Sequence, residues 1–266
     1  MGMKPTWLAV LALASSGCER IASGEQTGFE QHWNSALDTA EASPAPGAVA
    51  VIELFTSEGC SSCPAADKVL NDWAAATAKT GARVFPIALH VDYWNSANWS
   101  DRFSREAFSD RQQAYAHRMN LHGLYTPQAV IDGVTQLTGS DEAGLGKAVD
   151  SALRVASSTT LALATSTAGD QTRVTWTVHG APAGAVVDVA IVESGLVSHV
   201  EGGENLGRDL RHDNVVRTLV TRPVEEGTVS LAIPADVVRT HAGVVAWVQG
   251  SGGVGRIVAA SKVPLG

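Results

Sequence analysis

The chain has 266 residues, more than one hydrophobic core usually accommodates, so its length favours two domains. Its hydrophobic content of 45% is sufficient for ordinary cores. The 27 acidic residues outnumber the 19 lysines and arginines, the formal net charge is −8, and no cluster of basic residues occurs along the chain. The composition therefore argues against a nucleic-acid partner.

The first eighteen residues have the pattern of an export signal. Lys4 precedes a short apolar stretch from Trp7 to Ala14, and small residues then lead to Cys18. The stretch is far shorter than the roughly twenty apolar residues of a membrane-spanning helix. The junction SSGC resembles a lipoprotein box, with serine where leucine is usual, and ordinary cleavage nearby is the alternative. We expect residues 1–18 to be a signal peptide of the lipoprotein type. The protein would then be exported to the periplasm or cell envelope and held at the membrane only through a lipid on Cys18.

Residues 19–47 are rich in glycine, serine, alanine and glutamate, and they close with SPAPG, which predicts a tether. Four apolar residues fall on one helical face, so a short docked helix is the alternative: Phe29, Trp33, Leu37 and Ala40. The mature chain then carries two free cysteines, Cys60 and Cys63, in a compartment where disulfides persist.

Strand and helix patterns alternate over residues 48–152. The apolar run AVAVIELF (48–55) predicts a strand buried on both faces, and the helical pattern of residues 66–81 stops at a glycine. RVFPIALHV (83–91) predicts a second strand, parallel to the first. A helix is expected between residues 100 and 119, with Ser109 and Gln112 as a capping box, and a hairpin turning at Gly133 follows.

The stretch GCSSCP (59–64) lies where the first strand meets the first helix. Side chains three residues apart on a helix are about 5–6 Å apart, so Cys60 and Cys63 can form a disulfide. The unpaired N–H groups of a helix N-terminus favour the reactive thiolate of the first cysteine. Pro64 fits only the first helical turn, so the helix should begin at Ser61 or Ser62, and either hydroxyl could cap it.

Glu58, two residues before Cys60, is expected to be exposed and to disfavour the thiolate only slightly.

This segment resembles the thioredoxin superfamily: a strand, CxxC opening a helix, a second strand, then Thr-Pro before a hairpin. The resemblance covers residues 48 to about 152. It implies that the Thr126–Pro127 bond is cis beside the cysteines, and that the Thr126 backbone pairs with the substrate peptide. The region between His90 and Thr126 is longer than in a minimal thioredoxin, which implies a helical insertion over the site. Glu53 lies one residue further from the first cysteine than the buried acid familiar in thioredoxins, and a glycine replaces the usual aromatic residue before that cysteine.

Several longer motifs resemble a family of secreted, thioredoxin-like bacterial proteins catalogued as a domain of unknown function. The family has no settled activity, so the resemblance bears on the fold more than on the reaction. The motifs are ELFTSEGCSSCPAAD (53–67), HVDYWNSANWSDRFS (90–104), RQQAYA (111–116), YTPQAVIDG (125–133) and ENLGRDLRHDNVVR (204–217).

Thiol chemistry suggests the roles of the candidate site residues. Cys60 attacks a substrate disulfide, or is attacked when oxidised, and Cys63 resolves the mixed disulfide. Glu53 either relays the proton of Cys63 or lies at the strand end and reaches solvent. Substrate access requires an accessible Cys60 near Pro127, so a Cys60 sealed inside the fold or a Pro127 far from it would overturn the redox proposal.

His90 ends the second strand at the edge where such sheets place their sites, and a hydrogen bond to a neighbouring loop is its simplest role. Asp92, Trp94 and Trp99 could line the same cleft, although core packing is the simpler reading for the tryptophans.

From residue 158 the pattern changes to seven short alternating runs separated by turns, which predicts an immunoglobulin-like β-sandwich domain over residues 158–266. Val174, Trp176 and Val178 alternate inward. Residues 202–214 form a long polar loop that either folds over the thiol site or only joins strands, and His212 alone justifies no catalytic role.

The fold expected is therefore an α/β thioredoxin-like domain (48–152) with a helical insertion, followed by the β-sandwich. The leading functional hypothesis is an extracytoplasmic thiol–disulfide oxidoreductase that needs no cofactor and exchanges with protein thiols or disulfides and a redox partner. One alternative is a copper-handling protein using Cys60, Cys63 and His90, since thiolates suit Cu(I). The other is a non-catalytic, partner-binding lipoprotein in which the disulfide is structural.

Overall fold

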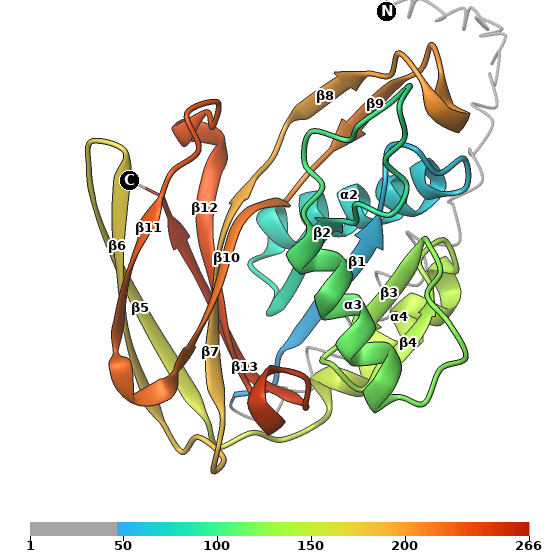
Figure 1. Cartoon of the computed structure of the whole chain (residues 1–266). Coiled ribbons are helices and arrows are strands. Elements are labelled where there is room, and N and C mark those ends of the chain that lie inside the picture. Colours follow the sequence, from blue (N-terminus) through green and yellow to red (C-terminus); the bar gives the residue numbers. More distant parts are fainter. Residues whose placement is uncertain (1–46, 266) are drawn as a thin grey trace, which may run out of the picture.

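One eight-stranded mixed sheet forms the centre of the protein (Figure 1). The structure is a computed structural model and describes residues 47–265, so the expected signal peptide, most of the tether and Cys18 lie outside the described residues. The strand order is β13-β12-β7-β10-β2-β1-β3-β4. Their bounds are β1 Ala50–Thr56, β2 Val84–His90, β3 Gln128–Ile131, β4 Thr135–Thr138, β7 Val186–Glu193, β10 Val215–Pro223, β12 Ala242–Gln249 and β13 Ile257–Pro264.

Three α-helices in the described part of the chain cover the end of this sheet that contains β1. Helices α2 (Cys63–Thr80) and α4 (Glu142–Leu153) pack on one face, and α3 (Glu106–Arg118) packs on the other. Successive residues of β1 point to opposite faces, so Ile52 and Leu54 meet α2 and α4 while Val51 and Phe55 meet α3. The prediction of a strand buried on both faces is confirmed, as is the parallel pairing of β1 with β2.

Helix α3 starts later than its sequence pattern predicts. It begins at Glu106, so residues 91–105 form an irregular loop between β2 and the helix. Ser109 lies inside the helix and its hydroxyl donates to Asp92 Oδ1, so the predicted capping box is wrong. The predicted stop of α2 is confirmed, because Gly81 takes a left-handed conformation with φ 68°.

A second, three-stranded sheet packs against the other end of the central sheet. It consists of β5 (Thr160–Ala168), β6 (Gln171–His179) and β11 (Thr228–Ala232). Val174 and Trp176 of β6 are buried against Val189 of β7 and Val244 of β12 in a shared core. All seven predicted strand runs are confirmed as strands, and the alternation of β6 is as predicted.

The strands after residue 158 are continuous with those before it. The expected domain boundary falls after α4, yet β10 pairs in parallel with β2 at Val215 and Ala88. Strands β10, β7, β12 and β13 therefore extend the sheet that β1 and β2 begin. The chain is a mixed α/β protein with a large central sheet. No helix among residues 47–265 is long and apolar enough to cross a membrane.

The predicted long loop 202–214 contains part of a hairpin. Strands β8 (Leu196–His199) and β9 (Asp209–His212) pair antiparallel, with a 3-10 turn at Gly203–Asn205 between them. This hairpin lies beside the start of α2 (Figure 1).

Candidate disulfide site

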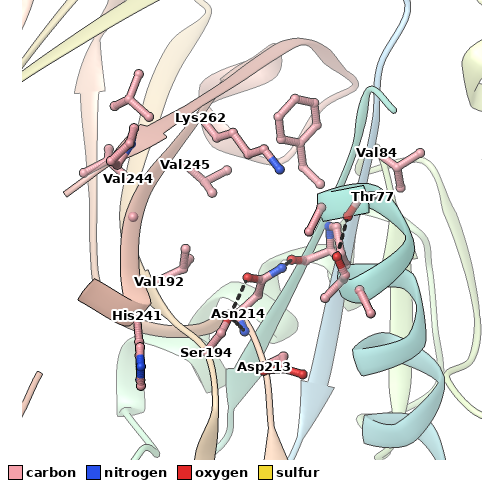
Figure 2. A pocket seen from close by; sticks show the side chains of 18 residues that line it. Thr77, Val84, Val192, Ser194, Asp213, Asn214, His241, Val244, Val245 and Lys262 are labelled. Atoms are coloured by element: carbon pink, nitrogen blue, oxygen red, sulfur yellow. Dashed lines mark hydrogen bonds between the residues drawn. The ribbon is translucent and has the colours of Figure 1, made fainter. Parts of the chain in front are cut away.

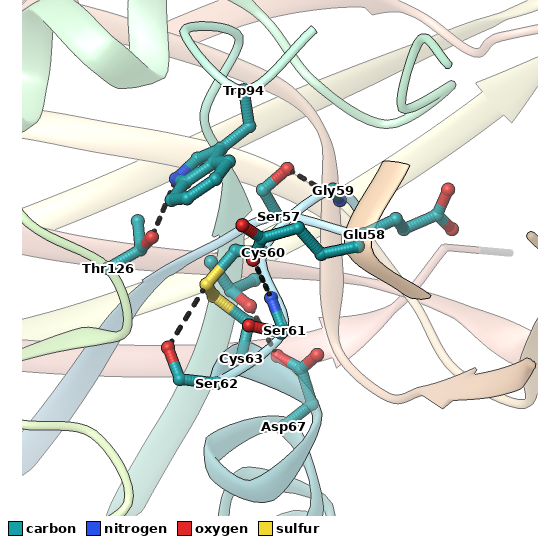
Figure 3. The surroundings of a disulfide bond; sticks show 12 residues. Ser57, Glu58, Gly59, Cys60, Ser61, Ser62, Cys63, Asp67, Trp94 and Thr126 are labelled. Carbon is teal, nitrogen blue, oxygen red and sulfur yellow. Dashed lines mark hydrogen bonds between the residues drawn. A yellow bond between two sulfur atoms is a disulfide. The ribbon is translucent and has the colours of Figure 1, made fainter. Parts of the chain in front are cut away.

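A disulfide joins Cys60 and Cys63 at the junction of β1 and α2, with 5.4 Å between the Cα atoms (Figure 3). Helix α2 begins at Cys63 itself, and Pro64 lies in its first turn as predicted. Ser62 precedes the helix but its hydroxyl does not cap it, so that expectation is wrong. The hydroxyl instead lies 3.3 Å from Cys60 Sγ.

The Thr126–Pro127 peptide bond is cis, which confirms the expectation from the thioredoxin resemblance. Pro127 packs close to the start of α2, because Gly139 fits between them: an added Cβ on Gly139 would lie 3.1 Å from Ala66 Cβ and 3.4 Å from Pro127 Cβ. Thr126 Oγ1 accepts a hydrogen bond of 2.7 Å from Trp94 Nε1. Figure 3 shows Trp94 and Thr126 together on one side of the disulfide.

Both cysteines are buried in this oxidised form. Cys60 is 1% exposed and Cys63 is fully buried, so the expectation of an accessible Cys60 is wrong. Within the segment from Cys60 to Cys63, only the two intervening serines, Ser61 and Ser62, are exposed.

The loop after β2 supplies one cover. An added Cβ on Gly59 would lie 3.3 Å from Trp94 Cβ and 3.2 Å from Trp94 O. Trp94 therefore fills the place beside Gly59, and a side chain there would displace it.

The turn at residues 203–205 supplies the second cover. Asn205 is fully buried and its Nδ2 donates to the carbonyls of Glu58 (2.9 Å) and Cys60 (2.8 Å). Glu204 Oε2 accepts from the Ser61 N–H at 2.9 Å. Hydrogen bonds to the Ser61 side chain and backbone lower the pKa of Glu204. Of the two alternatives for this segment, folding over the cysteines is confirmed.

A buried cluster of carboxylates and imidazoles lies beneath the cysteine loop. His90 Nδ1 lies 2.7 Å from Asp101 Oδ2, which confirms that His90 bonds a neighbouring loop. His212 Nε2 lies 3.4 Å from Glu58 Oε1, and the two imidazole rings are 4.9 Å apart. The expectation of an exposed Glu58 is wrong, because this residue is fully buried. Neither of its carboxylate oxygens has a hydrogen-bond partner among the described residues.

His90 and Asp101 interact electrostatically within this cluster. Burial opposes a charged imidazole, but the Asp101 carboxylate outweighs it and raises the pKa of His90 above its ordinary value. Burial likewise opposes a charged Asp101, but His90 and the backbone N–H groups of Glu58 and Phe103 lower the pKa of Asp101. Each group of this pair therefore favours the charged form of the other.

Asp67 is the acid on the helix face of Cys63. It lies four residues further along α2, a spacing that places side chains next to each other, and it is 4% exposed. Its Oδ1 accepts from the Thr56 hydroxyl at 2.7 Å. Its Oδ2 has no hydrogen-bond partner within residues 47–265 and lies 3.8 Å from His212 Nδ1. Burial raises the pKa of Asp67, against the opposing effect of His212 and His90. Asp67 thus holds its proton more firmly than an ordinary aspartate.

Glu53 lies elsewhere, on the α3 face of β1. Its carboxylate accepts from Arg111 Nε at 2.5 Å and from the Tyr115 hydroxyl, and Arg111 also donates to Gln249 Oε1. Glu53 is fully buried, so the reading in which it reaches solvent is wrong. The structure pairs it with Arg111 and gives it no contact with Cys63, so we assign the proton relay to Asp67 below.

The remaining residues considered from the sequence lie in the loop 91–105. Asp92 accepts from Ser109, and Trp99 packs against the covering turn, where an added Cβ on Gly202 would lie 3.1 Å from Trp99 Cβ. No group of three or more histidine, cysteine, aspartate or glutamate residues within 47–265 could hold a metal ion.

The fold and the site together define a mixed α/β protein with a disulfide-forming CxxC pair between a buried strand and a helix, beside a cis proline. The family model described as "Protein of unknown function (DUF1223)" matches residues 51–249, and the chain belongs to this family. A crystal structure of a protein from Agrobacterium tumefaciens is similar, with a TM-score of 0.60 and 28% identity over 84% of this chain and 97% of the other. No curated protein matched.

Proposed function

We propose that the protein is an extracytoplasmic thiol–disulfide oxidoreductase. The observation that carries this proposal is a CxxC disulfide at the start of a helix with a cis-proline loop packed against that helix. A disulfide in this position has a leaving sulfur next to helix N–H groups, which stabilise a thiolate.

The exchange proceeds in two steps. A substrate thiolate attacks Cys60 Sγ, the Cys60–Cys63 bond breaks, and Cys63 leaves as a thiolate that takes the proton of Asp67. A second substrate thiolate then attacks the substrate sulfur of the mixed disulfide, which releases a substrate disulfide and the Cys60 thiolate. In the opposite direction the Cys60 thiolate attacks a substrate disulfide and forms a mixed disulfide. Cys63 then attacks Cys60 Sγ, which releases the reduced substrate and restores the Cys60–Cys63 disulfide.

Access to Cys60 requires a change in its covers. Ser61 and Ser62 are exposed and mark the side from which a substrate approaches. Trp94 is tied to Thr126 by one hydrogen bond, whereas Asn205 is tied to the loop by two. Trp94 is therefore the cover that moves, and its departure frees the Thr126–Pro127 segment to pair with the substrate backbone.

Three finer expectations belong to the same proposal. The β1–α2–β2 unit with the β3–β4 hairpin is thioredoxin-like, supported by parallel β1–β2 and antiparallel β1–β3 and β3–β4 pairs. The two packed sheets of the later part form an immunoglobulin-like sandwich. The protein is exported, with a lipid on Cys18.

A structural disulfide is the second candidate function, and the burial of both sulfurs favours it. The reduction potential separates the two. A value between about −270 and −120 mV, the span of soluble oxidoreductases, supports exchange, whereas a value below about −300 mV marks a structural bond.

Trapping tests the proposed substrates directly. Cys63→Ser should accumulate mixed disulfides with envelope proteins through Cys60, and Cys60→Ser/Cys63→Ser should accumulate none. If Cys63→Ser yields no adducts, protein substrates are excluded.

A further inference from the structure

The central sheet opens into a cleft between β2 and β10. The two strands pair only at Val215 and Ala88, whereas the opposite edge of β10 pairs with β7 along its length from Val215 to Pro223. The first half of β2 therefore has no strand on that side. Pro86 suits this edge because it lacks an N–H, and its carbonyl accepts from Asn214 Nδ2 at 2.9 Å.

The cleft holds a cavity of about 460 Å³, a size typical of small-molecule sites. Its walls are mostly apolar. The run AAATA gives α2 short side chains on this side, which leaves space between the helix and the sheet. The lining includes Ala74, Ala78, Val84, Phe85, Val192 and Val245 (Figure 2).

One cation and a small polar group lie at opposite ends of this apolar space. Lys262 of β13 extends toward it in Figure 2, and the structure records no ion pair or hydrogen bond for its ammonium group among residues 47–265. Ser194 and Asn214, which bond each other at 3.0 Å, lie at the other end with His241 and Asp213. The Asp213 carboxylate, which accepts from the Gly195 N–H, disfavours an anion at that end, so a negative group would lie at Lys262. An apolar site with a single unpaired cation fits a ligand with one negative end and an apolar body.

We propose that this cleft binds a medium-chain fatty acid, with the carboxylate on Lys262 and the hydrocarbon chain along the valine and alanine walls. Burial of the chain provides the affinity, and the charge-assisted contact fixes its direction. The site is at the C-terminal half of α2, whereas the disulfide is at its N-terminus, so the proposal does not depend on the redox chemistry.

Calorimetric titration with decanoate, below its micelle concentration, tests the site. The mature chain, beginning at residue 18 and carrying Cys18→Ser so that it is not lipidated, should bind one decanoate saturably. Lys262→Glu should weaken binding at least about tenfold, the equivalent of one charged hydrogen bond. Lys79→Glu makes the same charge change on an exposed residue outside the cavity and should alter binding less than twofold.

Two further arms separate the apolar and charged contributions. Ala78→Leu, at an exposed helix position that accepts leucine, should also weaken binding because it fills the cavity. Decanol should bind the unaltered protein at least about tenfold more weakly than decanoate does. In the Lys262→Met variant, whose folding is checked by circular dichroism, decanol and decanoate should bind with equal affinity. Unsaturable binding, or equal losses in Lys262→Glu and Lys79→Glu, would overturn the proposal.

Discussion

The substitution Asn205→Ala tests how the turn at 203–205 holds the cysteine loop. Asn205 Nδ2 donates to two backbone carbonyls, those of Glu58 and Cys60, and its Oδ1 accepts from Arg208. All of these contacts are lost in alanine.

The two carbonyls are affected unequally. The Cys60 carbonyl keeps the Cys63 N–H at 3.2 Å, so it loses about 0.5–1.5 kcal/mol. The Glu58 carbonyl has no second partner among the described residues, and leaving it unpaired and buried costs about 1–3 kcal/mol. The free energy of unfolding should therefore fall by about 1.5–4.5 kcal/mol.

Urea unfolding followed by tryptophan fluorescence measures this loss as a lower midpoint at an unchanged slope. Asn98→Ala is the matched control, because Asn98 is exposed and its side chain makes no recorded hydrogen bond. The variant should also be reduced faster by dithiothreitol, since one cover is loosened. A loss below about 0.5 kcal/mol with an unchanged reduction rate would refute this account of the turn.

Three other outcomes follow from the structure. Arg111→Leu should destabilise the fold by about 3–5 kcal/mol because it leaves Glu53 buried without its cation, and adding Glu53→Gln should restore part of the loss in a double-mutant cycle; additive losses would contradict this. Burial raises the pKa of Asp132 to about 7, so the folded protein keeps a proton that the unfolded chain releases near the ordinary aspartate pKa of 3.8. The free energy of unfolding should therefore fall as pH rises from about 4 to about 7. Asp132→Asn should abolish this part of the pH dependence. Urea titrations that give the same pH profile for the variant and the unaltered protein would rule out this role of Asp132. Reduction of the disulfide should lower stability by only about 2 kcal/mol, because the closed loop is short, and a measured loss above about 4 kcal/mol would show that the bond does more than constrain the unfolded chain.

Local pattern was sufficient to predict the chain's elements and its cysteine pair. Continuous apolar runs predict buried strands, and CxxC followed by Pro64 predicts a helix start at Ser61 or Ser62, whereas α2 begins slightly later, at Cys63. The cis bond at Pro127 was predicted through family resemblance, because Thr-Pro in isolation is compatible with either isomer.

Contacts between distant segments were not predictable in this way. Glu58 was expected to be exposed because nothing near it in the sequence indicates that His212 and Asn205 fold against it. The relay role for Glu53 rests on its being an isolated acid in a buried strand and on the thioredoxin resemblance, whereas the two-residue period of β1 puts it with Val51 and Phe55 on the α3 face. The two-residue alternation of β1 is the sequence signal that shows on which face of the sheet Glu53 lies. The joining of β10 to β2 depends on a single residue pair and leaves no pattern in either strand.

The dependence of the cysteine loop on Asn205 has a consequence for biogenesis. The two residues that bond across this contact, Cys60 and Asn205, are 145 positions apart. A chain synthesised from its amino end therefore lacks this cover over both thiols until most of its length is present. The pair can be oxidised during that interval, before the turn that contains Asn205 has folded onto it.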